Sequence, residues 1–264
     1  MDLKIKDRIA LVTGASSGLG LAAAQRLSEE GVKLILSDLD EDELTEGTAG
    51  LDGVLARQTA DLTSVAGAES LHKLCQQHGG ADILVHTAGI TGAKGDPAEM
   101  KDEEFEECFQ TNFMSAVRLA RLFVKSMAEK GWGRVVFVTS ENAVQPYTDE
   151  AVYNASKAAL LNYAKCVPLA YGPKGVLINT VAPAFIKTPM TDGMMEKRAE
   201  EMGVSVDEAV ESFLEEERPY LTLKRRGRPE EVAAVMLLLC SDIASFTNGS
   251  AYRVDGGAVA AMNT

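Results

Sequence analysis

Seven short runs of β-branched and aliphatic residues recur along the chain, and longer stretches with helical periodicity separate most of them. The runs cover residues 9–12, 32–36, 54–58, 83–86, 134–139, 176–181 and 251–254. Strands that read as continuous apolar runs are buried on both faces, and their alternation with helices is typical of a parallel sheet with helices on each side. The sequence therefore predicts an α/β fold, with a doubly wound parallel sheet of about seven strands.

One stretch, residues 187–223, breaks this alternation. Two helix-like pieces, at about 192–202 and 206–217, follow each other there without a strand between them, and their acidic and apolar residues have amphipathic spacing. Two interpretations stay open: a helical hairpin packed on the core, or a lid over a ligand, since long excursions at strand ends commonly close active sites. The rest shows no Pro-, Gly- or Ser-rich linker, so we expect residues 1–264 to form one domain that carries 187–223 as an insertion.

Composition limits the partners. The net charge is -13, from 39 acidic and 26 basic residues, and such a chain repels phosphate backbones and anionic lipid heads. No apolar run approaches the ~18 residues of a membrane span, and charges at residues 2, 4 and 6–8 stand where a secretory signal needs an apolar stretch. The four cysteines form no C-x-x-C pair and share no metal-ligand spacing with the three histidines. We expect a soluble, cytoplasmic protein with reduced thiols, no metal, and neither nucleic acid nor a membrane as partner.

The first apolar run leads directly into a glycine-rich turn, Thr13-Gly14-Ala15-Ser16-Ser17-Gly18-Leu19-Gly20, and a helix-period stretch follows it. Glycines at a strand-to-helix turn permit a tight bend, let the backbone approach a pyrophosphate, and aim the free N–H groups of the helix at the anion. A glycine triplet alone is weak evidence, but its place after the first strand predicts a dinucleotide site and a Rossmann-type fold.

The second apolar run is followed by Asp38, eighteen residues beyond Gly20. A dinucleotide site places a carboxylate near this position, where it accepts hydrogen bonds from the adenosine ribose hydroxyls. A 2′-phosphate would be repelled by Asp38, and neither Ser17 nor Leu39 offers a basic side chain to offset that charge. We therefore expect NAD in preference to NADP. The alternative is that Asp38 only opens a polar turn at 38–42.

A candidate chemical site follows the fifth run. Tyr153 and Lys157 lie four residues apart at the start of a predicted helix that runs to about residue 170, so both project from one face. A fixed cation can lower the pKa of a tyrosine from about 10 toward neutrality, which would make Tyr153 a general acid or base. Ser140 ends the fifth run at the same predicted sheet edge, where its hydroxyl can bind a substrate oxygen. Asn112, inside a predicted helix at 102–129, is either functional or a buried, satisfied amide.

Together these residues resemble the short-chain dehydrogenase/reductase family over nearly the whole chain. The matching positions are T-G-x-x-x-G-x-G at 13–20, Asp61-Leu62, the tetrad Asn112, Ser140, Tyr153 and Lys157, the pattern at 179–190, and the motifs at 227–232 and 254–257. The resemblance implies hydride transfer between nicotinamide and a secondary alcohol or ketone, with Tyr153 exchanging the proton and Ser140 orienting the oxygen. Lys157 would lower the tyrosine pKa and bind the nicotinamide ribose, and Asn112 would hold a water in a proton relay.

The motifs and the resemblance together assign the remaining residues of the site. The expected cofactor residues are Gly14, Ser16, Ser17, Gly18, Leu19, Gly20, Asp38, Leu39, Asp61, Leu62, Thr87, Ala88, Gly89, Tyr153, Lys157, Pro183, Ile186 and Thr188. The expected substrate wall is Glu141, Val144, Gln145, Tyr147, Phe185, Met190 and Met194. This wall is mostly apolar and favours a small or medium, uncharged alcohol or ketone, and Glu141 could reject anions, bind a substrate hydroxyl or face solvent. The resemblance also implies a homotetramer or homodimer.

Three positions depart from the family pattern. His86-Thr87-Ala88-Gly89 stands where the family usually has N-N-A-G, so Thr87 replaces an asparagine that ties neighbouring strands together. Ala184 replaces a glycine and would be strained if that position needs a positive φ. Pro168 is expected to kink the helix that carries Tyr153, because it removes one N–H bond and crowds the carbonyl of Ala164.

Two other functions stay open at this point. One is an NADPH-dependent 3-oxoacyl-thioester reductase, which the same general pattern resembles. The other belongs to a different class: a non-catalytic nucleotide-binding module that keeps the fold without turnover. The intact tetrad argues against the second alternative.

Overall fold

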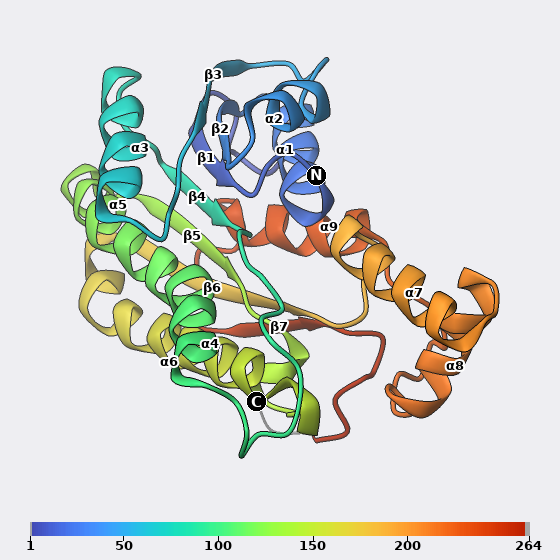
Figure 1. Cartoon of the computed structure of the whole chain (residues 1–264). Helices are drawn as coiled ribbons and strands as arrows, with labels where there is room; N and C mark the ends of the chain where they lie inside the picture. The colour runs from blue at the N-terminus through green and yellow to red at the C-terminus, as the bar shows by residue number, and fades with distance from the viewer. Residues whose placement is uncertain (1, 262–264) are drawn as a thin grey trace.

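The computed structural model describes residues 2–261 and builds them around one seven-stranded sheet with the order β3-β2-β1-β4-β5-β6-β7. The strands are β1 (Ile9–Thr13), β2 (Lys33–Asp38), β3 (Val54–Thr59), β4 (Ile83–His86), β5 (Gly133–Val138), β6 (Val176–Pro183) and β7 (Ala251–Val254). Every neighbouring pair is parallel. The chain runs outward from β1 to β3 and then returns to pair β4 with β1, as Figure 1 shows. The predicted doubly wound parallel sheet is thus confirmed, and its strand order reverses between β1 and β4.

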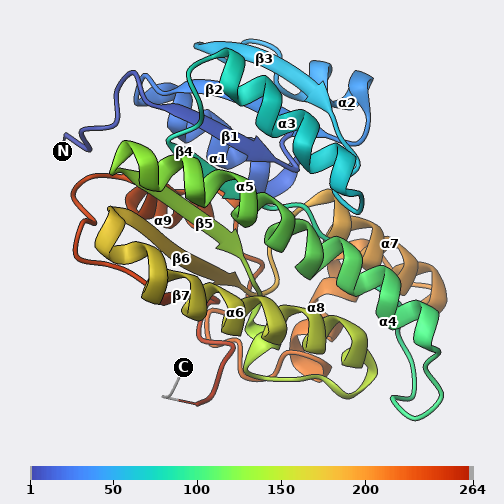
Figure 2. The ribbon, with the colours of Figure 1, turned by 90° about the vertical axis from the view of Figure 1, so that its left-hand side faces the viewer.

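Helices cover both faces of this sheet. The α-helices of residues 2–261 are α1 (Gly18–Glu29), α2 (Glu41–Gly47), α3 (Val65–Gln77), α4 (Asp102–Phe109), α5 (Ser115–Lys130), α6 (Ala151–Tyr171), α7 (Pro189–Met202), α8 (Val206–Glu216) and α9 (Pro229–Cys240). Helices α1 and α9 pack on one face, and α3, α5 and α6 cover the other, which is turned to the viewer in Figure 2. None of the helices within residues 2–261 has the length and apolar character needed to cross a membrane.

The side chains of each strand alternate between these two helical layers. In β1, Ala10 and Val12 are buried with α1 and α9, whereas Leu11 is buried with α3 and α5. This follows from the two-residue period of a strand, which sends successive side chains to opposite faces. Because helices cover both faces, most positions of the central strands are apolar, and this explains the continuous runs in the sequence.

The predicted continuous helix over residues 102–129 is interrupted in the structure. After α4, residues Gln110–Met114 form a π-helical turn, and α5 begins only at Ser115. Such turns contain one residue more than an α-helical turn and occur often at functional sites. Asn112 lies inside this turn and is completely buried. The amphipathic period alone gave no sign of the extra residue.

The segment after β6 leaves the sheet and forms a helical hairpin. Helices α7 and α8 pack against each other and stand beyond the carboxyl end of β6 (Figure 1). They enclose a small apolar core of their own, made by Phe185, Met195, Phe213, Leu214, Leu221 and Ala258. Gly203, with a left-handed φ of 66°, ends α7, and the Ser205 hydroxyl caps α8 by accepting a hydrogen bond from the backbone N–H of Glu208. Both predicted helices of this segment are therefore present.

Two of the three family departures concern the backbone. Helix α6 continues through Pro168 to Tyr171, and the kink expected at the proline stays a prediction. Among residues 2–261, the non-glycine residues with positive φ are Lys4, Asp7 and Lys224. Ala184 is not one of them, so its replacement of glycine stores no left-handed strain.

Burial against the sheet predicts that two adjacent leucines of α9 contribute very differently to the free energy of unfolding. Leu239 is 1% exposed in the core between α9 and the sheet, whereas Leu238 is 41% exposed on the same helix. Leu239→Ala should lower the free energy of unfolding by about 3 kcal/mol, because it leaves a cavity. Leu238→Ala has the same change in helix propensity and should lower it by less than about 1 kcal/mol. Urea unfolding measures both, and equal losses would contradict this packing.

Candidate active site

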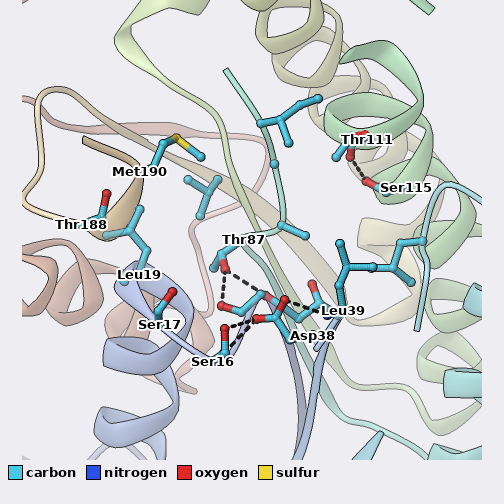
Figure 3. A pocket seen from close by; sticks show the side chains of 18 of the residues that line it. Ser16, Ser17, Leu19, Asp38, Leu39, Thr87, Thr111, Ser115, Thr188 and Met190 are labelled. Carbon is cyan, nitrogen blue, oxygen red and sulfur yellow. Dashed lines mark hydrogen bonds between the residues drawn. The ribbon is translucent and has the colours of Figure 1, made fainter. Parts of the chain in front are cut away.

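A cavity of about 400 Å³ opens at the edge where the strands end, around the point of strand reversal. Figure 3 shows part of its wall. The predicted residues that line it are Gly14, Ser16, Ser17, Gly18, Leu19, Asp38, Leu39, Asp61, Leu62, Thr87, Ala88, Gly89, Ser140, Tyr153, Lys157, Pro183, Ile186, Thr188 and Met190. The candidate cofactor site and three members of the candidate catalytic tetrad therefore share one cavity. In open α/β sheets, ligands bind at this kind of position.

The glycine turn has the shape that a pyrophosphate requires. Gly14 has a left-handed φ of 71°, and a Cβ there would lie 2.6 Å from the Thr87 hydroxyl oxygen. Gly20 does not line the cavity, because it packs behind the turn, where a Cβ would lie 1.9 Å from the Gly14 carbonyl oxygen. Helix α1 begins at Gly18 with no side-chain cap from Ser17 and no acidic residue in its first turn. Its first N–H groups are thus available to an anion in the cavity.

Asp38 joins the glycine turn to the end of β2. Its Oδ2 accepts hydrogen bonds from the Ser16 backbone N–H at 2.9 Å and from the Ser16 hydroxyl at 2.7 Å, and its Oδ1 accepts one from the Leu39 N–H at 2.8 Å (Figure 3). Glu43 and Asp61 also line this end of the cavity. Among the described residues of the wall, Lys157 is the one basic side chain. The end of the cavity near Asp38 is therefore acidic.

Thr87 and His86 replace the support that the family asparagine gives. The Thr87 hydroxyl donates to the Thr13 carbonyl at 2.8 Å and lies 3.3 Å from the Gly14 carbonyl, so it ties β4 to β1. The buried His86 ring bridges the hydroxyls of Thr13, at 2.7 Å from Nδ1, and Ser115, at 2.9 Å from Nε2. Burial lowers the pKa of His86 to about 3, so the ring is neutral. Through these two hydrogen bonds, the His86 ring links β4 to β1 and to α5.

Ser140, Tyr153 and Lys157 converge from two consecutive elements. Ser140 follows β5, while Tyr153 and Lys157 lie one turn apart near the start of α6. The Lys157 Nζ lies 5.6 Å from the centre of the Tyr153 ring and donates a hydrogen bond to the Val138 carbonyl at 3.0 Å. Burial lowers the pKa of Lys157 to about 8. The ammonium is thus held close to the phenol and is still protonated at neutral pH.

The pKa of Tyr153 differs from the sequence-based expectation. Burial raises the pKa of Tyr153 above its usual value, the charge of Glu141 raises it further, and a hydrogen bond with Ser140 opposes the change. The expected lowering of this pKa by Lys157 does not prevail, because burial is the largest influence on the phenol. The phenol therefore keeps its proton at neutral pH and is suited to act as an acid.

Asn112 is a fully bonded amide that holds the segment after β4. Its Nδ2 donates to the Ile90 carbonyl at 2.8 Å and to the Ser156 hydroxyl at 3.0 Å, and its Oδ1 accepts from the Ile90 N–H at 2.8 Å. A Cβ at Gly89 would lie 3.1 Å from this Oδ1 and 3.4 Å from the Lys157 Nζ. Asn112 thus anchors the backbone that passes beside Lys157, although it does not line the cavity itself.

The predicted substrate wall is divided among several places. Met190 lines the cavity. Phe185 is buried in the core of the α7–α8 hairpin, and Met194 packs against that core. Gln145 is bonded to the backbone of the C-terminal segment, to the Ala258 carbonyl and the Ala260 N–H. Val144 is partly buried beside Gln145, and Tyr147 lies under the guanidinium of Arg218. Of the predicted wall, only Met190 is among the residues that line the cavity.

Behind Ser140 lies a group of charged side chains that sequence reasoning missed, apart from Glu141. We name Lys94, Glu141, Glu150 and Arg218 the ion cluster. Arg218 is 7% exposed, its guanidinium lies 3.4 Å from the centre of the Tyr147 ring, and its nitrogens lie 3.7 Å from Glu141 and 3.3 Å from Glu150. Lys94 binds the same oxygen of Glu150, Oε1, at 2.6 Å. These residues come from three distant segments, and no spacing or motif in the sequence connects them.

Comparison with known proteins agrees with this geometry. The profile of the family described as Enoyl-(Acyl carrier protein) reductase matches residues 14–259. The chain is 34% identical to the oxidoreductase YvaG of Bacillus subtilis, over 98% of both chains, and 30% identical to human dehydrogenase/reductase SDR family member 4, over 96% of this chain and 88% of that one. The structure of L-sorbose reductase from Gluconobacter frateurii, complexed with NADPH and L-sorbose, superposes with a TM-score of 0.93 at 33% identity, over 99% of this chain and all of that one. The chain therefore belongs to the short-chain dehydrogenase/reductase family of NAD(P)-dependent oxidoreductases.

Proposed function

We propose that this chain transfers a hydride between NAD(H) and a secondary alcohol or ketone. The observation that carries the proposal is that Ser140, Tyr153 and Lys157 line the same cavity as the glycine turn and Asp38. The nicotinamide, when bound, supplies or accepts the hydride. The side chains of the protein have to bind the substrate oxygen and move its proton.

Tyr153 is the proton-transfer residue of this proposal. In the direction of reduction, its protonated phenol donates to the substrate oxygen as the carbonyl becomes an alcohol. In the direction of oxidation, the alcohol proton moves to the phenolate. The Lys157 ammonium lies close enough to stabilise the phenolate in either direction, and its pKa of about 8 keeps it charged at neutral pH. Asn112 acts as a positioning residue, because it fixes the backbone of Ile90 beside Lys157.

The preference for NAD over NADP rests on charge. A 2′-phosphate on the adenosine ribose would lie at the end of the cavity that Asp38, Glu43 and Asp61 line, and the basic residue of the wall, Lys157, lies beside Tyr153 instead. An uncompensated phosphate there would be repelled. The similar L-sorbose reductase was solved in complex with NADPH, which is an argument for NADP in this chain. Binding of the two cofactors therefore has to be compared directly.

Helices α7 and α8 are proposed to form a lid. Thr188 begins the segment, and Thr188, Met190 and Thr191 line the cavity at its base. Its two helices pack against each other, and long excursions at strand ends commonly close active sites. A carbonyl inside a sugar, as in the L-sorbose of the Gluconobacter protein, falls within the proposed substrate class. A 3-oxoacyl thioester belongs in the same substrate panel as the alternative.

The chain is also proposed to assemble into a homotetramer or homodimer. Two large apolar side chains support this: Leu169, on α6, is 78% exposed, and Phe246, after α9, is fully exposed. The resemblance gives the helix of Tyr153 as an interface, and Leu169 lies exposed on that helix. Light scattering coupled to gel filtration measures the mass of the particle, and a monomer at micromolar concentration would contradict this assembly.

The phenol of Tyr153 provides the most direct test of the reaction. Tyr153→Phe removes the proton donor and should lower kcat between about a hundredfold and ten-thousandfold, while NADH binding stays within about twofold. Tyr163→Phe removes a phenol from the same helix at a site that does not line the cavity, and it should leave kcat unchanged. The rate with each member of a panel of secondary alcohols and ketones is measured from the change in NADH absorbance. Full activity of the Tyr153 variant would contradict the role given to this phenol, whereas no turnover by the wild type with any member of the panel would favour the non-catalytic alternative.

The choice of cofactor is tested by binding. The wild-type protein should bind NADH at least about tenfold more tightly than NADPH, a difference of about 1.4 kcal/mol. Leu39 is 72% exposed at the mouth of the cavity, and Leu39→Arg places a cation beside the ribose, so NADPH affinity should rise about tenfold. Leu39→Gln adds a polar side chain without charge and should change neither affinity. Fluorescence titration measures all three proteins, and tighter NADPH binding by the wild type would overturn the role given to Asp38.

A further inference from the structure

The residue next to the candidate catalytic serine is a buried acid that the reaction outlined above does not use. Glu141 is 3% exposed, and its Oε2 accepts a hydrogen bond from the Ser140 hydroxyl at 2.6 Å. We propose that Glu141 is a positioning residue whose protonation decides where the Ser140 hydroxyl directs its proton, and thereby which direction of the reaction Ser140 supports. This inference rests on the proposed function and deepens it.

The argument begins with the single proton of the serine hydroxyl. A carboxylate can only accept hydrogen bonds, so ionised Glu141 takes the Ser140 proton and leaves Ser140 as an acceptor toward the cavity. A protonated carboxyl can itself donate to the Ser140 oxygen, and the Ser140 proton is then free to point at a substrate oxygen. Asn142 also surrounds this hydroxyl, with its Oδ1 at 3.0 Å as an acceptor and its backbone N–H at 3.3 Å as a donor. The Tyr153 phenol is the other titratable partner of Ser140, and burial raises its pKa, so it keeps its proton at neutral pH. The switch therefore depends on the protonation of Glu141.

The two states suit opposite directions of the reaction. A ketone oxygen has no proton, so it needs Ser140 as a donor, and protonated Glu141 allows this. An alcohol carries its own proton and can donate to a Ser140 oxygen that only accepts, and ionised Glu141 allows that. Protonated Glu141 thus favours reduction and ionised Glu141 favours oxidation, beyond the effect of pH on the proton released in the reaction itself.

Every charged or titratable group that faces Glu141 comes from the neighbouring elements of the site. Arg218, after α8, lies 3.7 Å away and favours the ionised form, while Glu150, just before α6, opposes it. Tyr153, on α6, and Tyr147, in the segment before it, carry the two nearby phenols. Burial is the largest influence and raises the pKa of Glu141 to about 7, with the Ser140 hydrogen bond and Arg218 lowering it from a still higher value. Glu141 therefore changes protonation close to neutral pH.

Arg218 connects this switch to the α7–α8 segment. Its guanidinium is stacked on the Tyr147 ring and shared between Glu141 and Glu150, and Glu150 is also bound by Lys94. Removal of the guanidinium charge would leave the buried carboxylate of Glu141 without a positive neighbour that stabilises its negative charge. The pKa of Glu141 would then rise further. A movement of this segment that withdrew Arg218 would have the same effect as the removal of its charge.

The test is the pH profile of kcat/KM for ketone reduction by the cofactor-saturated protein. In the wild type, the value should fall about tenfold per pH unit above about pH 7, as one proton is lost from Glu141. The amide of Glu141→Gln can donate to Ser140 as the protonated acid does. This variant should keep the low-pH value within about threefold and show no fall until about pH 8, where Lys157 titrates. An unchanged inflection near pH 7 in this variant would overturn the proposal.

Glu150→Gln is the matched control, because it makes the same change in the ion cluster at a residue that does not touch Ser140. It should keep the inflection but move it to lower pH, since a negative neighbour of Glu141 is removed. Loss of the inflection in this control would also count against Glu141. Arg218→Met should move the inflection to higher pH by the same logic.

An infrared titration decides the point without turnover. The carbonyl stretch of a protonated carboxyl should disappear near pH 7 in the wild type and be missing from Glu141→Gln, and Ser140→Ala should shift its frequency because the hydrogen bond is lost. Absence of such a band refutes the switch. If no ketone is reduced by the wild type with either cofactor, the proposed function fails, and the infrared result still stands for or against Glu141 as the partner of Ser140.

Discussion

The whole site depends on one constraint of parallel sheets, namely that all strands deliver their last residues to the same edge. In this chain, β1, β2, β4, β5 and β6 each end beside the cavity, and the strand order reverses between β1 and β4. At the reversal, the segments that follow β1 and β4 leave the sheet toward opposite sides, so the edge stays open between them. The glycine turn and the Tyr153 helix lie more than a hundred residues apart in sequence, and the sheet alone brings them to one crevice.

Much of this arrangement is predictable from the sequence because it obeys local rules. The seven apolar runs become the seven strands, since a strand between two helical layers has to be apolar on both faces. The glycine turn and Asp38 were found by their distance from strand ends, a distance that the short connections of the fold keep fixed. Family membership followed from several motifs in the right order, and the comparisons confirmed it.

The parts that could not be predicted depend on contacts between distant segments. Arg218 sits in an acidic stretch of the sequence and gives no sign that its guanidinium is buried against Tyr147 and Glu141. Phe185 was expected to face a substrate, but the hairpin that follows it encloses it in a separate core. The pKa of Tyr153 could not be judged either, because burial, the largest influence on it, is not revealed by spacing in the sequence.

The π turn has a further consequence for how this region can vary. An α-helix rotates by about 100° per residue, so one additional residue offsets the faces before and after the turn by that angle. Before the offset, Cys108 faces α6 and touches Asn112 and Ser156; after it, Leu119 and Phe123 face the sheet. Deletion of any single residue in this turn would restore a regular helix, and one of the two faces would then point the wrong way. Length is therefore more strictly fixed here than residue identity, and natural variants should substitute within the turn without shortening it.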